Sequence, residues 1–118
     1  MEQRIPPQNV EAEQAVLGAM LLSHDAVIVA MEKLQPRDFY RDAHRIIFEA
    51  MEHLHRENKE IDVITLPEEL NRMKKMDDVG GVGYVLNLPN MVGTASNAEY
   101  YANIVVEKAL SRNLISTC

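Results

Sequence analysis

The chain has 118 residues, with 18 acidic and 12 basic side chains and a formal net charge of −6 at pH 7. This length fits one domain, and the acidic balance argues against broad phosphate binding, which needs a clustered basic face. No apolar run approaches the ~20 residues of a membrane span, and no signal peptide opens the chain. The single cysteine, Cys118, excludes an internal disulfide and suits a reducing cytosol. We therefore expect a cytoplasmic domain that meets proteins and has no contact with a membrane.

The chain opens with an extended arm over residues 1–9, because Pro6-Pro7 fixes the backbone and stops regular structure. Asn9 can cap a first helix, with Glu11 in its first turn near the positive end of the helix dipole. Gly18 lies inside this helix at a cost of roughly 1 kcal/mol relative to alanine, which predicts a close approach to another helix. The stripe that defines the helix consists of Ala12, Ala15, Val16, Ala19 and Met20.

Two further helices follow. Ser23 can cap a second helix over Asp25–Leu34, which Pro36 closes. The third, over Asp42–Glu57, has the clearest pattern, and Asn58 is a plausible left-handed stop. Its apolar positions are Ala43, Ile46, Ile47, Ala50, Met51 and Leu54.

The middle of the chain is less regular. Ile61–Leu66 alternates weakly, as a strand would, but Thr65-x-x-Glu68 reads better as the capping box of a fourth helix that ends near Met76. Pro67 is tolerated in the first turn of a helix. Glycines at 80, 81 and 83 predict a loop, followed by a short helix over Val82–Leu88.

The last helix begins at a second capping box, Ser96-x-x-Glu99, and continues to Cys118 without a stop signal. We interpret it as a truncated helix in a fragment of a longer protein. The sequence thus predicts an all-α fold, a compact bundle of about six helices. Its parts are the arm (1–9), a helical globular domain (10–95) and a long C-terminal helix (96–118). The expected core comprises Val16, Met20, Ile46, Ile47, Ala50, Met51, Leu70 and Val105.

Little in the sequence indicates chemistry. No G-x-x-x-x-G-K-[ST] phosphate loop is present, and the glycine segment at 79–83 lacks the lysine and hydroxyl that such a loop needs. We expect the chain neither to bind nor to hydrolyse ATP. Cys118 has no candidate base near it in sequence, so a nucleophilic role is improbable. We assign no catalytic, cofactor-binding or metal-binding residue.

The histidines do not fit a metal site. His53 and His55 point to different sides of one helix, and His44 is too far from His55 along the axis to share an ion with it. We expect a partly packed His44 and solvated His53 and His55. His24 falls in a turn.

Basic side chains cluster only at Arg72, Lys74 and Lys75. We interpret this cluster as a solvated helix end and not as a phosphate-contact patch, because the acidic pair Asp77-Asp78 follows and reduces the local positive field. Two tyrosines, Tyr84 and Tyr100, are expected to present amphipathic rings outward, although ordinary partial burial is about as compatible with the pattern. The candidate protein-interface residues are Glu11, Tyr84, Tyr100, Val106 and Leu110.

Three strings of the sequence resemble one known family. They are EQRIPPQNVEAEQAVLGAM (2–20), DFYRDAHRIIFEAM (38–51) and NAEYYANIVVEK (97–108). Two shorter segments, IDVIT (61–65) and GGVGY (80–84), lie between the second and third strings, in the order in which that family has them. Together they resemble the N-terminal domain of bacterial replicative DNA helicases of the DnaB type. Pro67 departs from the family pattern and leaves the start of the fourth helix in doubt.

The resemblance implies a small helical bundle without catalysis. In this family the domain pairs into a collar on a hexamer, a trimer of dimers, and helps to receive primase and the helicase loader. A helical hairpin and a linker would follow, leading to an ATPase domain that binds ATP and Mg²⁺, unwinds duplex DNA and makes most contacts with DNA. Two alternatives stay open: a stand-alone enzyme, and a small helical DNA-binding module of the helix-turn-helix kind.

Overall fold

The structure is a computed structural model and describes residues 9–92 and 97–116. Within these ranges the chain forms α-helices and short 3₁₀-helices and contains no strand, so the predicted all-α class is confirmed and the strand alternative for Ile61–Leu66 is wrong. The elements are α1 (Val10–Leu22), α2 (His24–Lys33), η1 (Pro36–Asp38), α3 (Asp42–Arg56), α4 (Thr65–Arg72), η2 (Asp77–Val79), α5 (Gly81–Asn87), η3 (Leu88–Met91) and α6 (Ala98–Ser116).

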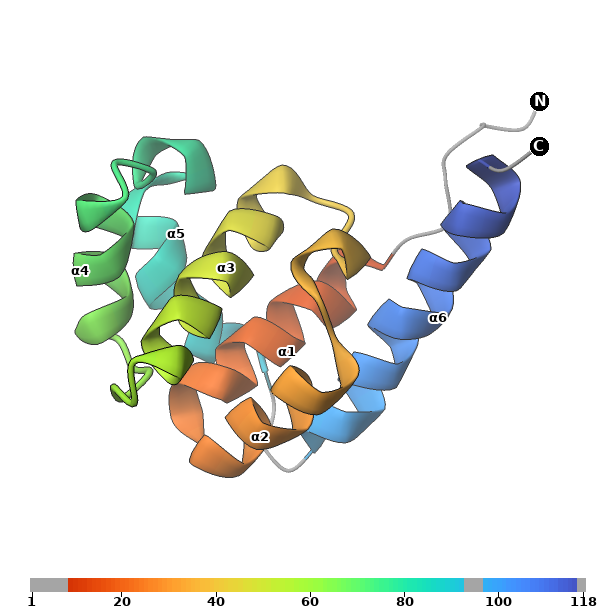
Figure 1. The fold of residues 1–118 in the computed structure, drawn as a ribbon, viewed down its shortest axis with the longest axis horizontal. Helices are drawn as coiled ribbons and strands as arrows, with labels where there is room; N and C mark the ends of the chain where they lie inside the picture. The colour runs from red at the N-terminus through yellow and green to blue at the C-terminus, as the bar shows by residue number, and fades with distance from the viewer. Residues whose placement is uncertain (1–8, 93–96, 117–118) are drawn as a thin grey trace.

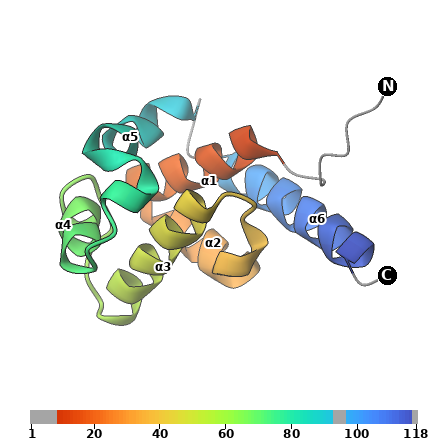
Figure 2. The ribbon, with the colours of Figure 1, turned by 90° about the horizontal axis from the view of Figure 1, so that it is seen from above.

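Helix α1 is the centre of the bundle. It contacts α2, α3, η3 and α6, while α4 and α5 lie at one end of the molecule and α6 runs along the other (Figures 1 and 2). A helix that is apolar on nearly all sides must be covered on nearly all sides. Accordingly, the residues of α1 from Ala15 to Leu21 are all buried.

The predicted helix starts of α1 and α2 are confirmed. Asn9 Oδ1 accepts a hydrogen bond from the backbone N–H of Ala12 at 2.9 Å, and Ser23 Oγ accepts one from Ala26 at 3.5 Å. Each cap pairs a backbone N–H that has no partner within its own helix. After α3, Asn58 adopts φ = 59°, the predicted left-handed stop. The second predicted capping box of this kind, at Ser96, lies outside the described residues, as does the arm up to residue 8.

Gly18 makes the close approach that its position predicted. A Cβ atom on Gly18 would lie 2.2 Å from the carbonyl oxygen of Leu88, which is far inside contact distance. The neighbour is the backbone of η3 and not the side of a long helix. The absence of a side chain at Gly18 therefore lets η3 pack directly on α1.

The predicted capping box of the fourth helix is wrong. Asp62 caps α4: its Oδ1 accepts hydrogen bonds from the N–H groups of Ile64 and Thr65 at 2.8 and 2.9 Å. Thr65 is already the first helical residue, and its hydroxyl donates to the carbonyl of Glu60 at 2.8 Å. The helix also ends earlier than predicted, at Arg72, because Lys74 turns to φ = 61°.

The glycine loop is shorter than predicted. Gly80 and Gly81 have φ values of 102° and 89°, which favour glycine, but α5 begins at Gly81 itself. The turns η1 and η2 were not predicted.

Seven of the eight predicted core residues are buried, and Ile46 is the exception, since it is half-buried at the edge of the core. Two aromatic residues that the prediction left out, Phe39 and Phe48, are fully buried with ring centroids 5.1 Å apart. Helix α6 contributes Ala98, Ala102, Val105 and Ala109, small residues that let it lie close to α1 and α2.

Candidate interaction surface and the buried network beneath it

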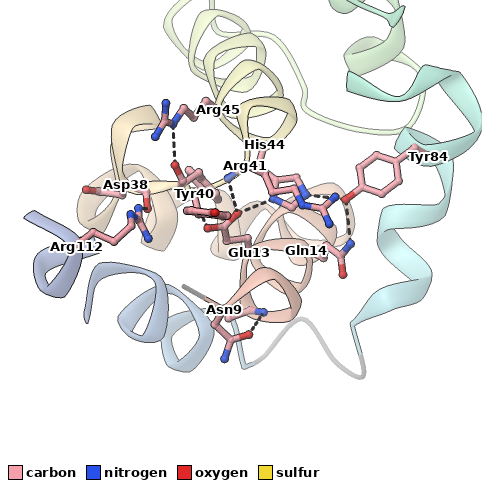
Figure 3. A network of polar contacts seen from close by, with 12 residues as sticks. Asn9, Glu13, Gln14, Asp38, Tyr40, Arg41, His44, Arg45, Tyr84 and Arg112 are labelled. Carbon is pink, nitrogen blue, oxygen red and sulfur yellow. Dashed lines mark hydrogen bonds and ion pairs between the residues drawn. The ribbon is translucent and has the colours of Figure 1, made fainter. Parts of the chain in front are cut away.

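Glu13 is a buried carboxylate at the centre of the bundle, with only 1% of its surface exposed. It accepts hydrogen bonds from the backbone N–H groups of Tyr40 at 2.6 Å and Arg41 at 3.5 Å, and His44 Nδ1 lies 2.7 Å from its Oε1 (Figure 3). A buried charge without partners is costly, and three converging donors offset that cost.

His44 joins this carboxylate to α5. It is fully buried, whereas the sequence predicted only partial packing. The difference comes from its pairing with Glu13, which local sequence does not show. Its Nε2 lies 2.6 Å from the Tyr84 hydroxyl, which also accepts a hydrogen bond from the Gln14 amide at 3.0 Å.

These contacts have one consistent direction. With an ionised Glu13, which can only accept, the hydrogen of His44 lies on Nδ1; in a neutral imidazole Nε2 then accepts from the Tyr84 hydroxyl. The Gln14 amide then donates to Tyr84, Tyr84 to His44, and His44 to Glu13. We call Glu13, Gln14, His44 and Tyr84 the polar network.

The segment between η1 and α3 is held from other sides as well. Arg45 Nε donates to the carbonyl of Phe39 at 2.7 Å, and Arg112 Nη2 donates to the carbonyl of Asp38 at 2.8 Å. The Arg112 guanidinium also lies 5.5 Å from the centre of the Tyr40 ring. The late turns of α6 are therefore tied to the same backbone that supplies donors to Glu13.

Two candidate interface residues, Glu11 and Tyr100, lie on one open groove between α1, η3 and α6. The groove has a volume of about 510 Å³. Tyr100 is 65% exposed, and its ring meets that of Tyr101 edge to face at 5.5 Å. The lining residues are Asn9, Glu11, Ala12, Gln14, Ala15, Met91, Tyr100, Tyr101 and Ile104. We call this the α1–α6 groove.

Tyr84 lies on a second hollow of about 310 Å³, beside Arg41, Gly80 and the acidic pair Asp77-Asp78. The ring is half-buried, as in the partial-burial alternative, and its hydroxyl points inward because His44 and Gln14 bind it. Gln14 also lines the α1–α6 groove, so the Gln14–Tyr84 hydrogen bond joins a lining residue of one hollow to a lining residue of the other.

The remaining two candidates lie further along α6. Leu110 is 59% exposed and lies ten residues beyond Tyr100, about 15 Å along the axis. Val106 is half-buried and packs against the core, so it is less exposed than predicted. The structure thus places Glu11 and Tyr100 on one hollow and Tyr84 on the other, and Val106 and Leu110 line neither.

Sequence reasoning missed Gln14, Met91 and Ile104 at the groove and the exposed pair Val82 and Leu86 on α5. The sequence shows three polar residues, Glu11, Glu13 and Gln14, near the start of α1, but the pattern does not distinguish the buried Glu13 from the exposed Glu11.

A separate ionic cluster lies between α3 and α4. The Arg72 side chain hydrogen-bonds Glu69 and holds the pKa of that carboxyl below its ordinary value, against the opposing effect of burial. His53 Nδ1 lies 3.0 Å from Glu69 without hydrogen-bond alignment, so His53 is not simply solvated as expected. His55 is half-buried and, with His24, lines a pocket of about 220 Å³.

The described residues contain no group of three or more side chains that could hold a metal ion. Among the described helices, none has the length and apolar character to cross a membrane.

These residues define a small all-α domain built around one buried helix and a polar network, with open hollows on its surface. Residues 5–107 match the family of the DnaB-like helicase N terminal domain, and the chain belongs to that family. The resemblance inferred from the sequence motifs is confirmed.

Relatives of known identity agree. The chain is 48% identical over 115 residues to the replicative DNA helicase DnaB of Geobacillus stearothermophilus and 46% identical over 117 residues to the replicative DNA helicase DnaC of Bacillus subtilis. These alignments cover 98% and 99% of this chain but 25% and 26% of the relatives. The chain therefore spans about a quarter of the length of the curated relatives that it matches.

The fold is shared as well. The crystal structure of the N-terminal domain of DnaB helicase from Mycobacterium tuberculosis matches with a TM-score of 0.92 and 46% sequence identity. The match covers 95% of this chain and 81% of that chain.

Proposed function

We propose that this chain serves as the non-catalytic interaction and oligomerisation domain of a hexameric, ATP-dependent replicative DNA helicase that unwinds duplex DNA at the replication fork in the cytoplasm. The observation that carries the proposal is the fold match at a TM-score of 0.92 and 46% identity to a DnaB N-terminal domain. ATP and Mg²⁺ would be bound by an ATPase domain outside this chain, which would also make most of the contacts with DNA.

The interaction role rests on the surface around the two hollows. Tyrosine and methionine are enriched where proteins meet, and the α1–α6 groove is lined by Tyr100, Tyr101 and Met91. Glu11 supplies a carboxylate, and among the described residues that line the groove there is no lysine, arginine or histidine. This composition fits a protein partner better than nucleic acid, whose phosphates need basic contacts. We propose that primase and the helicase loader dock here.

Sedimentation of the chain, alone and mixed with the C-terminal domain of primase, tests the proposal. We expect the mixture to form a larger species, and Tyr100→Ala to weaken it. Leu22→Ala is the matched control, since Leu22 is also largely exposed but lies at the opposite end of α1 from Glu11. A mixture that sediments as two separate proteins, or a chain that retards short duplex DNA at physiological salt, would contradict the assignment.

A further inference from the structure

We propose that Glu13 and His44 are positioning residues for the docking surface, which they control through Tyr84 and Gln14 without contacting the partner. The proposal rests on the function proposed above and adds the means by which the surface is held in shape. Glu13 and His44 are 1% and 0% exposed, so neither can touch a bound protein. Their hydrogen bonds nevertheless lead to Tyr84 and Gln14, which each line one of the two hollows.

The element that needs positioning is α5. It has seven residues and a single fully buried side chain, Val85, while Val82 and Leu86 are 49% and 46% exposed. A helix of this length has little stability of its own and takes its place from tertiary contacts. Helix α5 packs mainly against the neighbouring turns η2 and η3.

Tyr84 links this short helix to the centre of the bundle. Among the described residues, the side-chain hydrogen bonds from α5 to α1 and α3 both end on its hydroxyl, at Gln14 and His44. The rings of Tyr84 and His44 are nearly parallel, with an interplanar angle of 12° and centroids 6.0 Å apart. Gly80 lies next to Tyr84, and a Cβ added to Gly80 would be 3.4 Å from the Tyr84 Cβ.

In the neutral imidazole Nε2 accepts from the Tyr84 hydroxyl, and Glu13 favours this tautomer by accepting the hydrogen on Nδ1. Glu13 in turn is oriented by the N–H groups of Tyr40 and Arg41. The buried carboxylate therefore fixes the tautomer of His44, which fixes the Tyr84 hydroxyl and, through it, the exposed Val82 and Leu86 and the Gln14 amide.

Two substitutions at His44 separate these contacts. His44→Asn places an amide where Nδ1 lies and keeps a donor for Glu13, but it removes the acceptor for Tyr84. His44→Gln places its amide near the Nε2 position and keeps an acceptor for Tyr84. Tyr84→Phe removes the hydroxyl from the other side and leaves His44 and Glu13 in contact.

The experiment measures two quantities for each variant: the NMR signals of the Tyr84 ring and the Val82 and Leu86 methyl groups, and the affinity for the primase C-terminal domain. We expect His44→Asn and Tyr84→Phe each to shift these signals and to weaken binding about tenfold, as the loss of one hydrogen bond allows. Their effects should not add in the double variant, since both remove the same bond. His44→Gln should keep both the NMR signals and the affinity close to those of the unsubstituted chain. The ring signals of Tyr100 should stay unchanged in every variant.

Unchanged Tyr84, Val82 and Leu86 signals in folded His44→Asn and Tyr84→Phe overturn the proposal, and so do shifted signals with undiminished affinity. If the unsubstituted chain does not bind primase while the signals respond as described, the proposed function fails and the positioning role stands. Tyr84→Phe carries the test if His44→Asn does not fold, because Tyr84 is half-buried and keeps its ring.

Discussion

Glu13 and His44 are ionisable residues that α1 and α3 bury completely, and their partners explain why the core tolerates them. The Glu13 carboxylate meets one imidazole and two backbone N–H groups. Removing one member of a buried, paired set leaves the others without partners, and this costs more than the set contributes relative to an apolar core. The cost of a single substitution should therefore be high at both positions.

Glu13→Gln should lower the free energy of unfolding by about 2–3 kcal/mol, because the new amide turns a donor toward groups that are themselves donors. Urea denaturation monitored by circular dichroism measures the loss. The matched control is Glu11→Gln, two residues earlier and exposed, which should change stability by less than about 0.5 kcal/mol. Equal effects of the two substitutions would show that the Glu13 contacts contribute nothing specific.

Glu69 predicts a pH dependence of stability. Its pKa in the folded state is lowered from 4.5, mainly by the hydrogen bond from Arg72. A lowered carboxyl pKa stabilises the folded state at pH values above the unfolded pKa, and that stabilisation is lost as pH falls through the folded pKa. Glu69→Gln should therefore destabilise the domain at pH 7, and the difference from the unsubstituted chain should shrink as pH falls through the lowered pKa of Glu69.

Thermal melts of the two proteins across pH 3–7 check this. Glu68→Gln, at the exposed neighbouring residue, is the control and should show a nearly constant difference from the unsubstituted chain. A Glu69→Gln deficit that persists undiminished in acid would contradict the role of the Glu69 charge.

At the scale of elements, Gly18 sets the distance between α1 and η3. Gly18→Ala should destabilise the domain by about 1–3 kcal/mol, since the added methyl would lie 2.2 Å from a carbonyl oxygen. This outweighs the helix propensity that alanine gains, about 1 kcal/mol. Gly83→Ala is the control: it lies in α5 with nothing within 4 Å of an added Cβ, and it should stabilise slightly. A melting temperature raised by both substitutions would contradict the close approach.

Local signals predicted these elements well where one residue decides the outcome. Asn9, Ser23 and Asn58 act on the backbone within a few positions, and all three act as expected. The start of α4 was wrong because Asp62 and Thr65 can both cap a helix, and the contacts of Thr65 with Glu60 decide between them. Local sequence does not rank two such caps.

The candidate site was harder to predict for a physical reason. The exposure of Tyr100 and Leu110 follows from helical periodicity, which the sequence contains. The orientation of Tyr84 depends on His44 and Gln14, 40 and 70 positions away in the chain. Glu13 and His44 fall in two separate motif strings, and only the folded chain shows that the motifs meet.

For the whole molecule, the exposed side of α6 predicts weak self-association. Tyr100 and Leu110 are 65% and 59% exposed, and we expect a concentration-dependent dimer in which both copies use the same surface. Leu110→Glu should abolish it and leave the melting temperature unchanged. Val106→Glu should instead lower the melting temperature, because Val106 packs against the core.

Sedimentation up to millimolar concentration measures the association. Leu22→Glu is the control, since Leu22 is 56% exposed on a different element, α1. A chain that remains monomeric at millimolar concentration, or a dimer that Leu110→Glu leaves intact, would place the interface elsewhere.

The attachment of Arg112 to the Asp38 carbonyl and the Tyr40 ring has a mechanical consequence. Tension on the last turns of α6 would reach, through Arg112, the backbone that supplies two donors to Glu13. A pull at this end of the domain would thus be shared between the surface of α6 and the interior of the bundle. The resistance of the domain to such a pull would then depend on the buried Glu13 carboxylate as well as on the contacts that α6 makes at the surface.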